Sequence, residues 1–546
     1  MNSSPTTISR DLRPLAAILA LGTLAIFAAI LAAGHRVIPD DVFFYLEIAD
    51  RIVDGEGSTF SGLMPTNGYH PLWMGMNVTL RALVGEDPAT RVSALLVATA
   101  IGNLAAIALA FRLTQKLGLS LYLAPVFIAA YTAANHLGSE LHLSLPLLIA
   151  SLSFTLSLKT QQTGPTRRPT HLIGLGLLFG LTALARLDNA FCIAALGLVA
   201  LDWRGPRRTL IRDASLIGLG GALVLGPYFA WNLATFGHLI PISGAVKSGL
   251  AALDGPTPSK MGSQGLLLFA LCIFAPLYFW KRARRNAGNS PERRLAVTVF
   301  AFALGALAHA LYVLFKGQAI WTWYFATELI TASLFVTAVL DRLVARLTRP
   351  RDLPTPSPSS LRRLIQPPVL TAIFAAGLLA LIFVKYLRVD PGPRWYEEAA
   401  AWIDREVPEG GAVVTTNSPG GIAFFAARPI MALDGLTGDF AWHERAALVG
   451  LYESLRERGV THVVTMGDAQ TVAPWIERTR RVGHGGEGPT FEGEINPDGT
   501  TRLERVGMFS GIVHRQVGWL STHPDDLVSR CPCGFAMWRL APATTP

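Results

Sequence analysis

Apolar runs long enough to cross a lipid bilayer recur about eleven times along this chain. A helix needs about 20 apolar residues to span about 30 Å of hydrocarbon. The runs cover residues 15–33, 92–113, 119–134, 141–158, 172–185, 190–203, 216–232, 265–280, 296–315, 325–340 and 369–386. With 51% hydrophobic and only 16% charged residues, the 546-residue chain is too apolar for an ordinary soluble protein. The sequence therefore predicts a polytopic α-helical membrane protein with about eleven transmembrane helices.

Two of these runs leave a choice of interpretation. The first run, 15–33, is longer than the core of a usual secretion signal, so we interpret it as a retained helix rather than a cleaved signal. The runs 172–185 and 190–203 flank the polar segment Arg186 to Asn189 and are short, which leaves either two spans or one buried hairpin. Because they form a pair, this choice does not change the orientation of the other spans.

The basic residues predict that orientation. Short loops rich in Lys and Arg stay in the cytoplasm. Such clusters occur in alternate loops, at Lys159, Arg167 and Arg168, at Arg204, Arg207, Arg208 and Arg212, at Lys281, Arg282, Arg284 and Arg285, and at Arg342, Arg346, Arg349 and Arg351. The net charge of +9 therefore reflects membrane topology rather than nucleic-acid binding. We expect a cytoplasmic N-terminus and polar chemistry on the outer side.

The composition changes to that of a soluble domain after Tyr386. We expect a transmembrane domain over residues 1–388 and an extracytoplasmic α/β domain over 389–546. Within the latter, residues 412–414 and 462–465 are predicted strands, and 395–403 and 446–455 are predicted helices. The segment Ser418 to Gly421 lacks the spacing of a phosphate-binding loop and is interpreted as a plain turn.

Two adjacent carboxylates, Asp40 and Asp41, open the first outer loop, residues 34–72. Behind them, Val42, Leu46 and Ala49 recur at helical spacing, which predicts an amphipathic helix lying on the membrane face. One aspartate is enough to cap a helix, and two side by side repel each other. We therefore favour a functional role for the pair over capping alone.

Further polar residues on the predicted outer side are candidates for substrate binding. Each also has a plainer interpretation, as a first-turn acid, a loop residue, an ion pair with Asp188 or an aromatic residue at the lipid interface. They are Asn67, Tyr69, His70, Glu140, Arg186, Lys247 and Trp323. Asp41 and Glu140 also have the oxygen ligands that hard divalent cations such as Mg²⁺, Mn²⁺ or Ca²⁺ take, although their spacing does not establish a metal site.

These features together resemble the GT-C superfamily of membrane glycosyltransferases, in particular its bacterial arabinofuranosyltransferase-like and mannosyltransferase-like members. The resemblance lies in Asp40 and Asp41 after the first span, the run from Thr66 to Trp73, Gly138 to Glu140, and the trailing α/β domain. It implies a plasma-membrane enzyme of the cell envelope that uses a sugar on a polyprenyl phosphate. It also implies that an aspartate of the first outer loop is catalytic.

The implied reaction is an inverting single displacement onto a glycan, lipid or protein acceptor. One carboxylate takes the proton of the acceptor hydroxyl while the lipid phosphate leaves. We favour Asp40 as this base and expect Asp41 to cap or orient. The alternatives are a transporter or flippase of lipid-linked sugars and a non-catalytic scaffold with the same fold. A transporter predicts charged or broken helices at the membrane midplane, usually in paired repeats.

Overall fold

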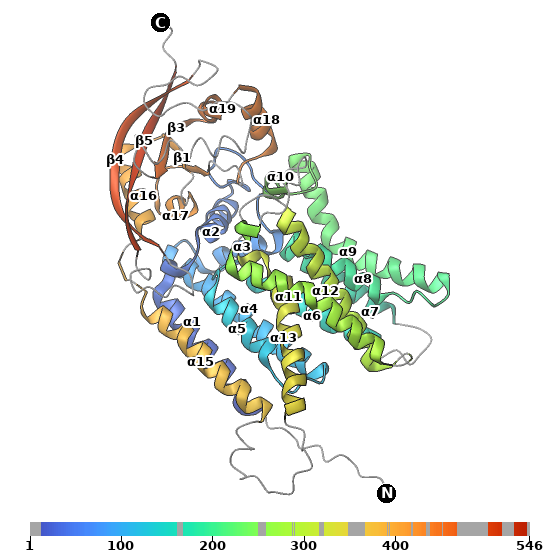
Figure 1. The fold of residues 1–546 in the computed structure, drawn as a ribbon. Coiled ribbons are helices and arrows are strands. Elements are labelled where there is room, and N and C mark those ends of the chain that lie inside the picture. Colours follow the sequence, from blue (N-terminus) through green and yellow to red (C-terminus); the bar gives the residue numbers. More distant parts are fainter. Residues whose placement is uncertain are drawn as a thin grey trace, which may run out of the picture.

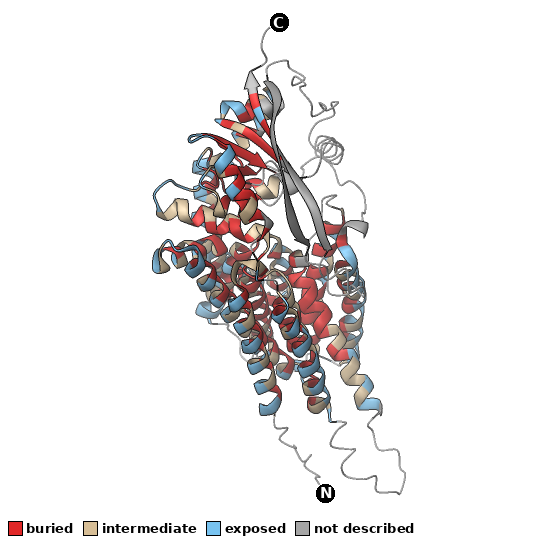
Figure 2. Ribbon diagram, turned by 90° about the vertical axis from the view of Figure 1, so that its left-hand side faces the viewer, coloured by how far each residue is buried: buried red, intermediate tan, exposed pale blue. Residues whose placement is uncertain are grey.

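The protein is described by a computed structural model, which covers residues 12–542 apart from 161–167, 249–257, 287, 289, 316–321, 348–365, 390, 393, 416–418, 433–436, 450, 467–500 and 516–528. A bundle of long helices forms one part, and an α/β region caps one end of it (Figure 1). The burial of residues follows this arrangement. Buried residues gather where the helices meet, and exposed residues lie along the outer faces of the bundle (Figure 2).

Every apolar run of the sequence is helical. The corresponding helices are α1 (Arg13–Ala33), α4 (Pro88–Lys116), α5 (Leu123–Ala134), α6 (Leu141–Thr160), α7 (Pro169–Ala185), α8 (Ala190–Ala200), α9 (Arg207–Phe236), α11 (Gly262–Arg285), α12 (Pro291–Phe315), α13 (Ala326–Leu347) and α15 (Pro367–Leu387). By length and composition, seven of the described helices can cross a membrane, namely α1, α4, α6, α9, α11, α12 and α15. The helices α5, α7 and α8 are shorter. The predicted class of fold is confirmed.

Helix α13 is as long as some of these seven helices but is not one of them, and it carries charged residues near both ends. It has 22 residues, but it contains Glu328 near its start and Asp341 and Arg342 near its end. Glu328 is fully buried, so the protein and not lipid surrounds this carboxylate. Its presence inside an apolar run indicates a specific partner, because an unpaired charge at that depth is costly.

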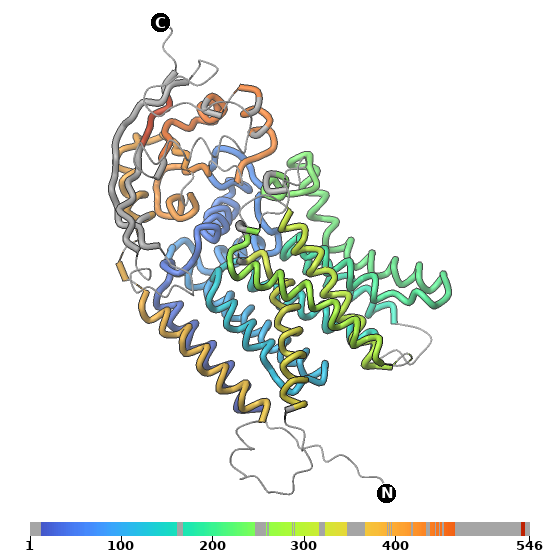
Figure 3. Tube along the Cα trace, viewed as in Figure 1, coloured from blue at the N-terminus to red at the C-terminus, as the bar shows by residue number. Residues whose placement is uncertain are grey.

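Two helices join the bundle to the α/β region. Helix α2 (Asp40–Val53) follows α1, and α3 (Pro71–Val84) precedes α4. The prediction that α2 lies on the membrane face is wrong, because its apolar face is buried in protein. Phe43 is fully buried and packs against Phe424 and Phe425 of the α/β region, with ring centroids 5.1 and 6.1 Å apart. In Figure 3, α2 lies between the α/β region and the bundle.

The α/β region contains a five-stranded sheet of order β2-β1-β3-β5-β4. Its elements are α16 (Trp395–Glu406), β1 (Ala412–Thr415), α17 (Pro419–Phe425), β2 (Ile430–Ala432), α18 (Phe440–Val449), α19 (Leu451–Glu457), β3 (Val460–Met466), β4 (Thr501–Arg515) and β5 (Ser529–Pro542). Strand β1 runs parallel to β2 and β3, with Val414 opposite Met431 and Val463. Strand β5 runs antiparallel to β3 and β4.

Both predicted strands are present, and the residues described within 446–455 are helical as predicted, in α18 and α19, with residue 450 outside the described residues. One other local prediction of this region is corrected. The segment predicted as a plain turn contributes Pro419, Gly420 and Gly421 to the first turn of α17, and Ser418 lies outside the described residues. Proline is well suited to the first turn of a helix, because its fixed φ matches the helix and its missing N–H has no partner there anyway.

Candidate functional site

The acidic pair lies in the first turn of α2, where the helix dipole favours negative charge. Pro39 precedes the helix in an extended conformation, so α2 begins abruptly at the pair. The two carboxylates have different surroundings. Asp40 Oδ1 accepts a hydrogen bond of 2.7 Å from the backbone N–H of Gly421 in α17. Asp41, unlike Asp40, lines a small pocket that it shares with Glu140.

Three segments that are far apart in the sequence build this pocket. Its lining is Pro39, Asp41, Val42, Tyr45, His136, Ser139, Glu140 and Trp323, from the start of α2, the segment between α5 and α6, and the residues before α13. Tyr45 follows Asp41 by four residues, which places both on one face of α2. The Tyr45 hydroxyl accepts a hydrogen bond of 3.1 Å from the backbone N–H of His70. The pocket therefore collects two carboxylates, a phenol, an imidazole and an indole.

Burial decides the protonation of two groups in the pocket. It raises the pKa of the Tyr45 phenol well above its ordinary value, and it lowers the pKa of His136 to about 3. Both side chains are therefore uncharged at neutral pH. The His136 ring packs against Trp323, with centroids 3.8 Å apart. Trp323 is 8% exposed, so it belongs to this pocket and not to the aromatic belt at a lipid interface.

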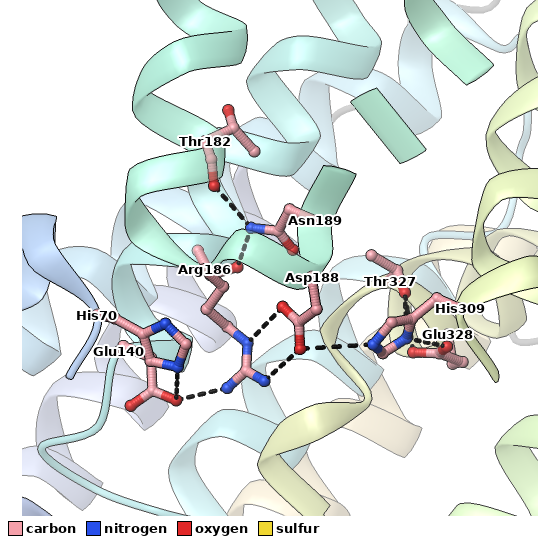
Figure 4. A network of polar contacts seen from close by, with 10 residues as sticks. His70, Glu140, Thr182, Arg186, Asp188, Asn189, His309, Thr327 and Glu328 are labelled. Atoms are coloured by element: carbon pink, nitrogen blue, oxygen red, sulfur yellow. Dashed lines mark hydrogen bonds and ion pairs between the residues drawn. The ribbon is translucent and has the colours of Figure 1, made fainter. Parts of the chain in front are cut away.

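A chain of ionic contacts leads from Glu140 into the bundle (Figure 4). The guanidinium of Arg186 donates from Nη1 to Glu140 Oε1, and from Nε and Nη2 to the two carboxylate oxygens of Asp188, at 3.1 and 2.6 Å. Arg186 is 1% exposed, and its Cζ lies 5.1 Å from the centre of the Tyr324 ring. Because two carboxylates hold this cation in a buried position, Arg186 orients Glu140.

The chain continues to α12 and α13. His309 Nε2 lies 3.4 Å from Asp188 Oδ2, and its Nδ1 lies 2.7 Å from Glu328 Oε1. The Thr327 hydroxyl donates to the other Glu328 oxygen at 2.9 Å. Acids and bases alternate from Glu140 to Glu328, which offsets the cost of burying each charge.

The remaining predicted residues occupy separate positions around the pocket. His70 Nε2 lies 3.6 Å from Glu140 Oε1, and the His70 side chain is 29% exposed. The Tyr69 hydroxyl is 2.7 Å from Ser58 Oγ in the same loop. Asn67 is fully buried in the same loop. Its side-chain amide donates a hydrogen bond of 3.1 Å to Asn232 Oδ1 near the end of α9. Its side-chain oxygen accepts one of 2.8 Å from the backbone N–H of Ile242, the first residue of α10 (Ile242–Ser248). The side chain of Lys247 lies outside the described part of the structure.

Sequence reasoning did not select several residues of this site. The spacing of Tyr45 could have identified it, since it stands one helical turn after Asp41 and therefore on the same face of the helix. His309 and Glu328 could have been identified as well, because ionisable residues inside apolar runs usually have a function or a buried partner. No feature of the sequence identifies His136 and Ser139, since only the fold brings the segment before α6 against the start of α2.

The same contacts bear on the expected divalent cation. Asp41 and Glu140 do share the pocket, but Glu140 already binds the guanidinium of Arg186. A metal ion there would compete with this buried cation. Among the described residues, no group of three or more His, Cys, Asp or Glu side chains is arranged to hold a metal. The divalent cation at Asp41 and Glu140 stays a prediction, with Oε1 of Glu140 engaged by Arg186.

No protein-family model and no curated protein matches the sequence. Solved structures do match. ArnT from Cupriavidus metallidurans bound to undecaprenyl phosphate aligns with a TM-score of 0.53 and 15% identity, over 96% of this chain and 97% of that chain. The archaeal oligosaccharyltransferase AglB from Archaeoglobus fulgidus, in complex with an inhibitory peptide and a dolichol-phosphate, aligns with a TM-score of 0.52 and 13% identity, over 82% of this chain and 69% of that chain. At such identities the similarity concerns the fold.

Proposed function

We propose that this chain, which has the fold of the GT-C membrane glycosyltransferases, transfers a sugar from a polyprenyl-phosphate donor to an acceptor on the outer side of the membrane. One observation carries the proposal. Asp41 and Glu140 meet in a pocket at the end of the helix bundle that the α/β region caps. The two matched structures named above were solved with a polyprenyl phosphate, which supports a lipid-linked donor.

In this proposal Asp41 is the general base. Its carboxylate takes the proton of the acceptor hydroxyl while the hydroxyl oxygen forms a bond to the anomeric carbon of the sugar. The bond from that carbon to the phosphate oxygen breaks, and the phosphate keeps the electron pair. A single displacement of this kind inverts the anomeric configuration. A positioned base typically contributes about 100- to 10,000-fold to the rate.

The departing phosphate needs positive charge or hydrogen-bond donors nearby. His70 is the best-placed described residue, because its ring is partly exposed beside Glu140 and a ring N–H can donate a hydrogen bond to a phosphate oxygen. Lys247 is a second candidate, since the helix α10 that carries it is tied to the same loop through Asn67. Arg186 acts one step away, by holding Glu140 in place.

A transporter of lipid-linked sugars is the second candidate, and one observation favours it. His309 and Glu328 form a buried ionic contact inside two helices of the bundle, and ion pathways use such groups. The contact is continuous with Arg186 and Glu140, however, so it also serves to hold the pocket. Transfer of sugar by the purified protein separates the two functions.

The first test is the substitution Asp41→Asn. Asparagine keeps the size and much of the hydrogen bonding of aspartate but has no basicity. We expect turnover to fall about 100-fold or more while donor binding changes little. The measurement is transfer of sugar from a panel of polyprenyl-phosphate sugars by purified protein, with donor binding measured in parallel. Normal transfer by Asp41→Asn would show that Asp41 is not the base.

A further inference from the structure

The α/β region touches the acidic pair directly, through the first turn of α17. Besides the hydrogen bond from the Gly421 N–H to Asp40 Oδ1, the backbone of Gly420 lies against the backbone of Asp40. A Cβ at Gly420 would lie 2.5 Å from the Asp40 carbonyl oxygen, and a Cβ at Gly421 would lie 3.0 Å from the ring of Tyr396. Only glycine allows α17 to approach α2 this closely.

Aromatic side chains extend this contact along α2. Phe43 packs edge-on against Tyr396 of α16, with centroids 5.5 Å apart, in addition to its contacts with Phe424 and Phe425. Arg91 of α4 lies over the Phe424 ring, with Cζ 4.9 Å from the centroid, and donates to the Leu46 carbonyl of α2 at 3.1 Å. Arg91 thus joins α4 to both α17 and α2.

The contact has a consequence for Asp41. Asp40 and Asp41 are consecutive in the first turn of α2, so a rotation or shift of that turn moves both carboxylates together. The Asp40 carboxylate fixes one side of the turn to α17, and Asp41 then lies in the pocket with Glu140. An oxygen acceptor at Asp40 is sufficient for the bond to the Gly421 N–H, and a base is not required.

We propose that Asp40 is a positioning residue, through which α17 sets the orientation of Asp41 for sugar transfer. This rests on the proposed function, and it makes the α/β region part of the transfer machinery whichever acceptor is used. The base and the positioning residue are then neighbours in the chain. A displacement of a catalytic group by about 1 Å can cost about 100-fold in rate, so the loss of this contact lowers turnover.

Three substitutions separate positioning from base catalysis. Asp40→Asn keeps an oxygen that accepts from Gly421, so we expect turnover within about threefold of the unchanged protein. Asp40→Ala removes the acceptor, and Gly420→Ala pushes α17 away while leaving both carboxylates intact. For these two we expect kcat to fall about 10- to 100-fold with little change in the donor KM. Gly75→Ala in α3 is the control, because nothing lies within 4 Å of its added Cβ.

The contact also has a readout that needs no substrate. Hydrogen exchange of the α2 amides reports the order of this helix directly. We expect faster exchange over residues 40–46 in Asp40→Ala and Gly420→Ala, and unchanged exchange in Asp40→Asn and Gly75→Ala. If even the unchanged protein transfers no sugar from any donor of the panel, the proposed function fails. The exchange data would still decide whether α17 orders α2.

Two results would overturn the positioning role. One is an Asp40→Asn variant as inactive as Asp41→Asn, since a residue that only accepts a hydrogen bond tolerates this change. The other is a folded Gly420→Ala variant with normal turnover and normal exchange in α2. If Gly420→Ala is too unstable to measure, the two Asp40 variants still provide the test. Asp40→Asn keeps the hydrogen-bond acceptor and Asp40→Ala removes it, so their turnover and exchange are compared directly.

Discussion

At the scale of single residues, the choice between Asp40 and Asp41 as the base depends on a contact between Asp40 and Gly421, which are 381 positions apart in the chain. The sequence favoured Asp40 because Asp41 is further into the helix and better placed to cap. In the structure Asp40 binds the first turn of another helix, α17, through Gly421. Asp41 lines the pocket with Glu140. We therefore propose Asp41 as the base and Asp40 as the residue that positions it. The Asp41→Asn, Asp40→Asn and Asp40→Ala substitutions test this assignment.

Arg186 gives a second prediction at this scale. Its guanidinium lies between Glu140 and Asp188, and replacing it with glutamine leaves the buried Glu140 and the partly buried Asp188 without this cation. Breaking a buried ionic contact from one side costs about 3–5 kcal/mol. We expect Arg186→Gln to lower the Tm of the purified protein clearly. Arg456→Gln, which breaks an exposed pair with Glu453, is the control and should cost at most about 1 kcal/mol. Equal losses of Tm would contradict the buried network.

At the scale of elements, close helix packing sets the position of Glu140. Glu140 immediately precedes α6, and α6 crosses α4 where Gly102 meets the backbone carbonyl of His142. A Cβ at Gly102 would overlap this oxygen, so the two helices need glycine to approach. Gly102→Ala should separate α4 from α6, displace Glu140 and reduce both Tm and sugar transfer. Gly377→Ala in α15, where the added Cβ meets nothing within 4 Å, should leave both unchanged.

Helix α2 illustrates a limit of periodicity at the same scale. The spacing of Val42, Leu46 and Ala49 correctly predicts a helix with one apolar face, but it does not identify what covers that face. Lipid and protein both satisfy an apolar surface, and here the α/β region supplies Phe424 and Phe425. The same holds for Trp323, whose indole suits an interface with lipid and is in fact buried beside His136.

At the scale of the whole molecule, the proposed orientation places the pocket and the α/β region outside the cytoplasm. The prediction is tested by labelling intact cells with an impermeant thiol reagent. Cysteine at Glu86, whose side chain is 85% exposed at the start of α4, should label, and cysteine at the exposed Arg204 should not. The background carries serine at Cys531 and Cys533, while Cys192 and Cys272 are buried. The opposite pattern of labelling would reverse the topology.

The amino-acid sequence by itself determined the helices of this protein. A run of apolar residues becomes a helix where it crosses lipid, because no water is present to bind its backbone groups. All eleven runs are helical, and seven of the described helices are long and apolar enough to cross a membrane. The α/β character of the last region follows in the same way from local alternation, and Asp41, Glu140 and Trp323 stand out as polar or aromatic residues at the ends of apolar runs.

Only the tertiary structure decided which of these residues meet. It brought Glu140, Arg186, Asp188 and His309 from three segments into one ionic chain, and it assigned Asp40 to α17 and Asp41 to the pocket. The physical reason is that apolar burial is roughly proportional to area and indifferent to direction, so it specifies that a helix packs without specifying its partner. Hydrogen bonds, ionic contacts and close approaches at glycine are directional, and they exist only once distant segments have met.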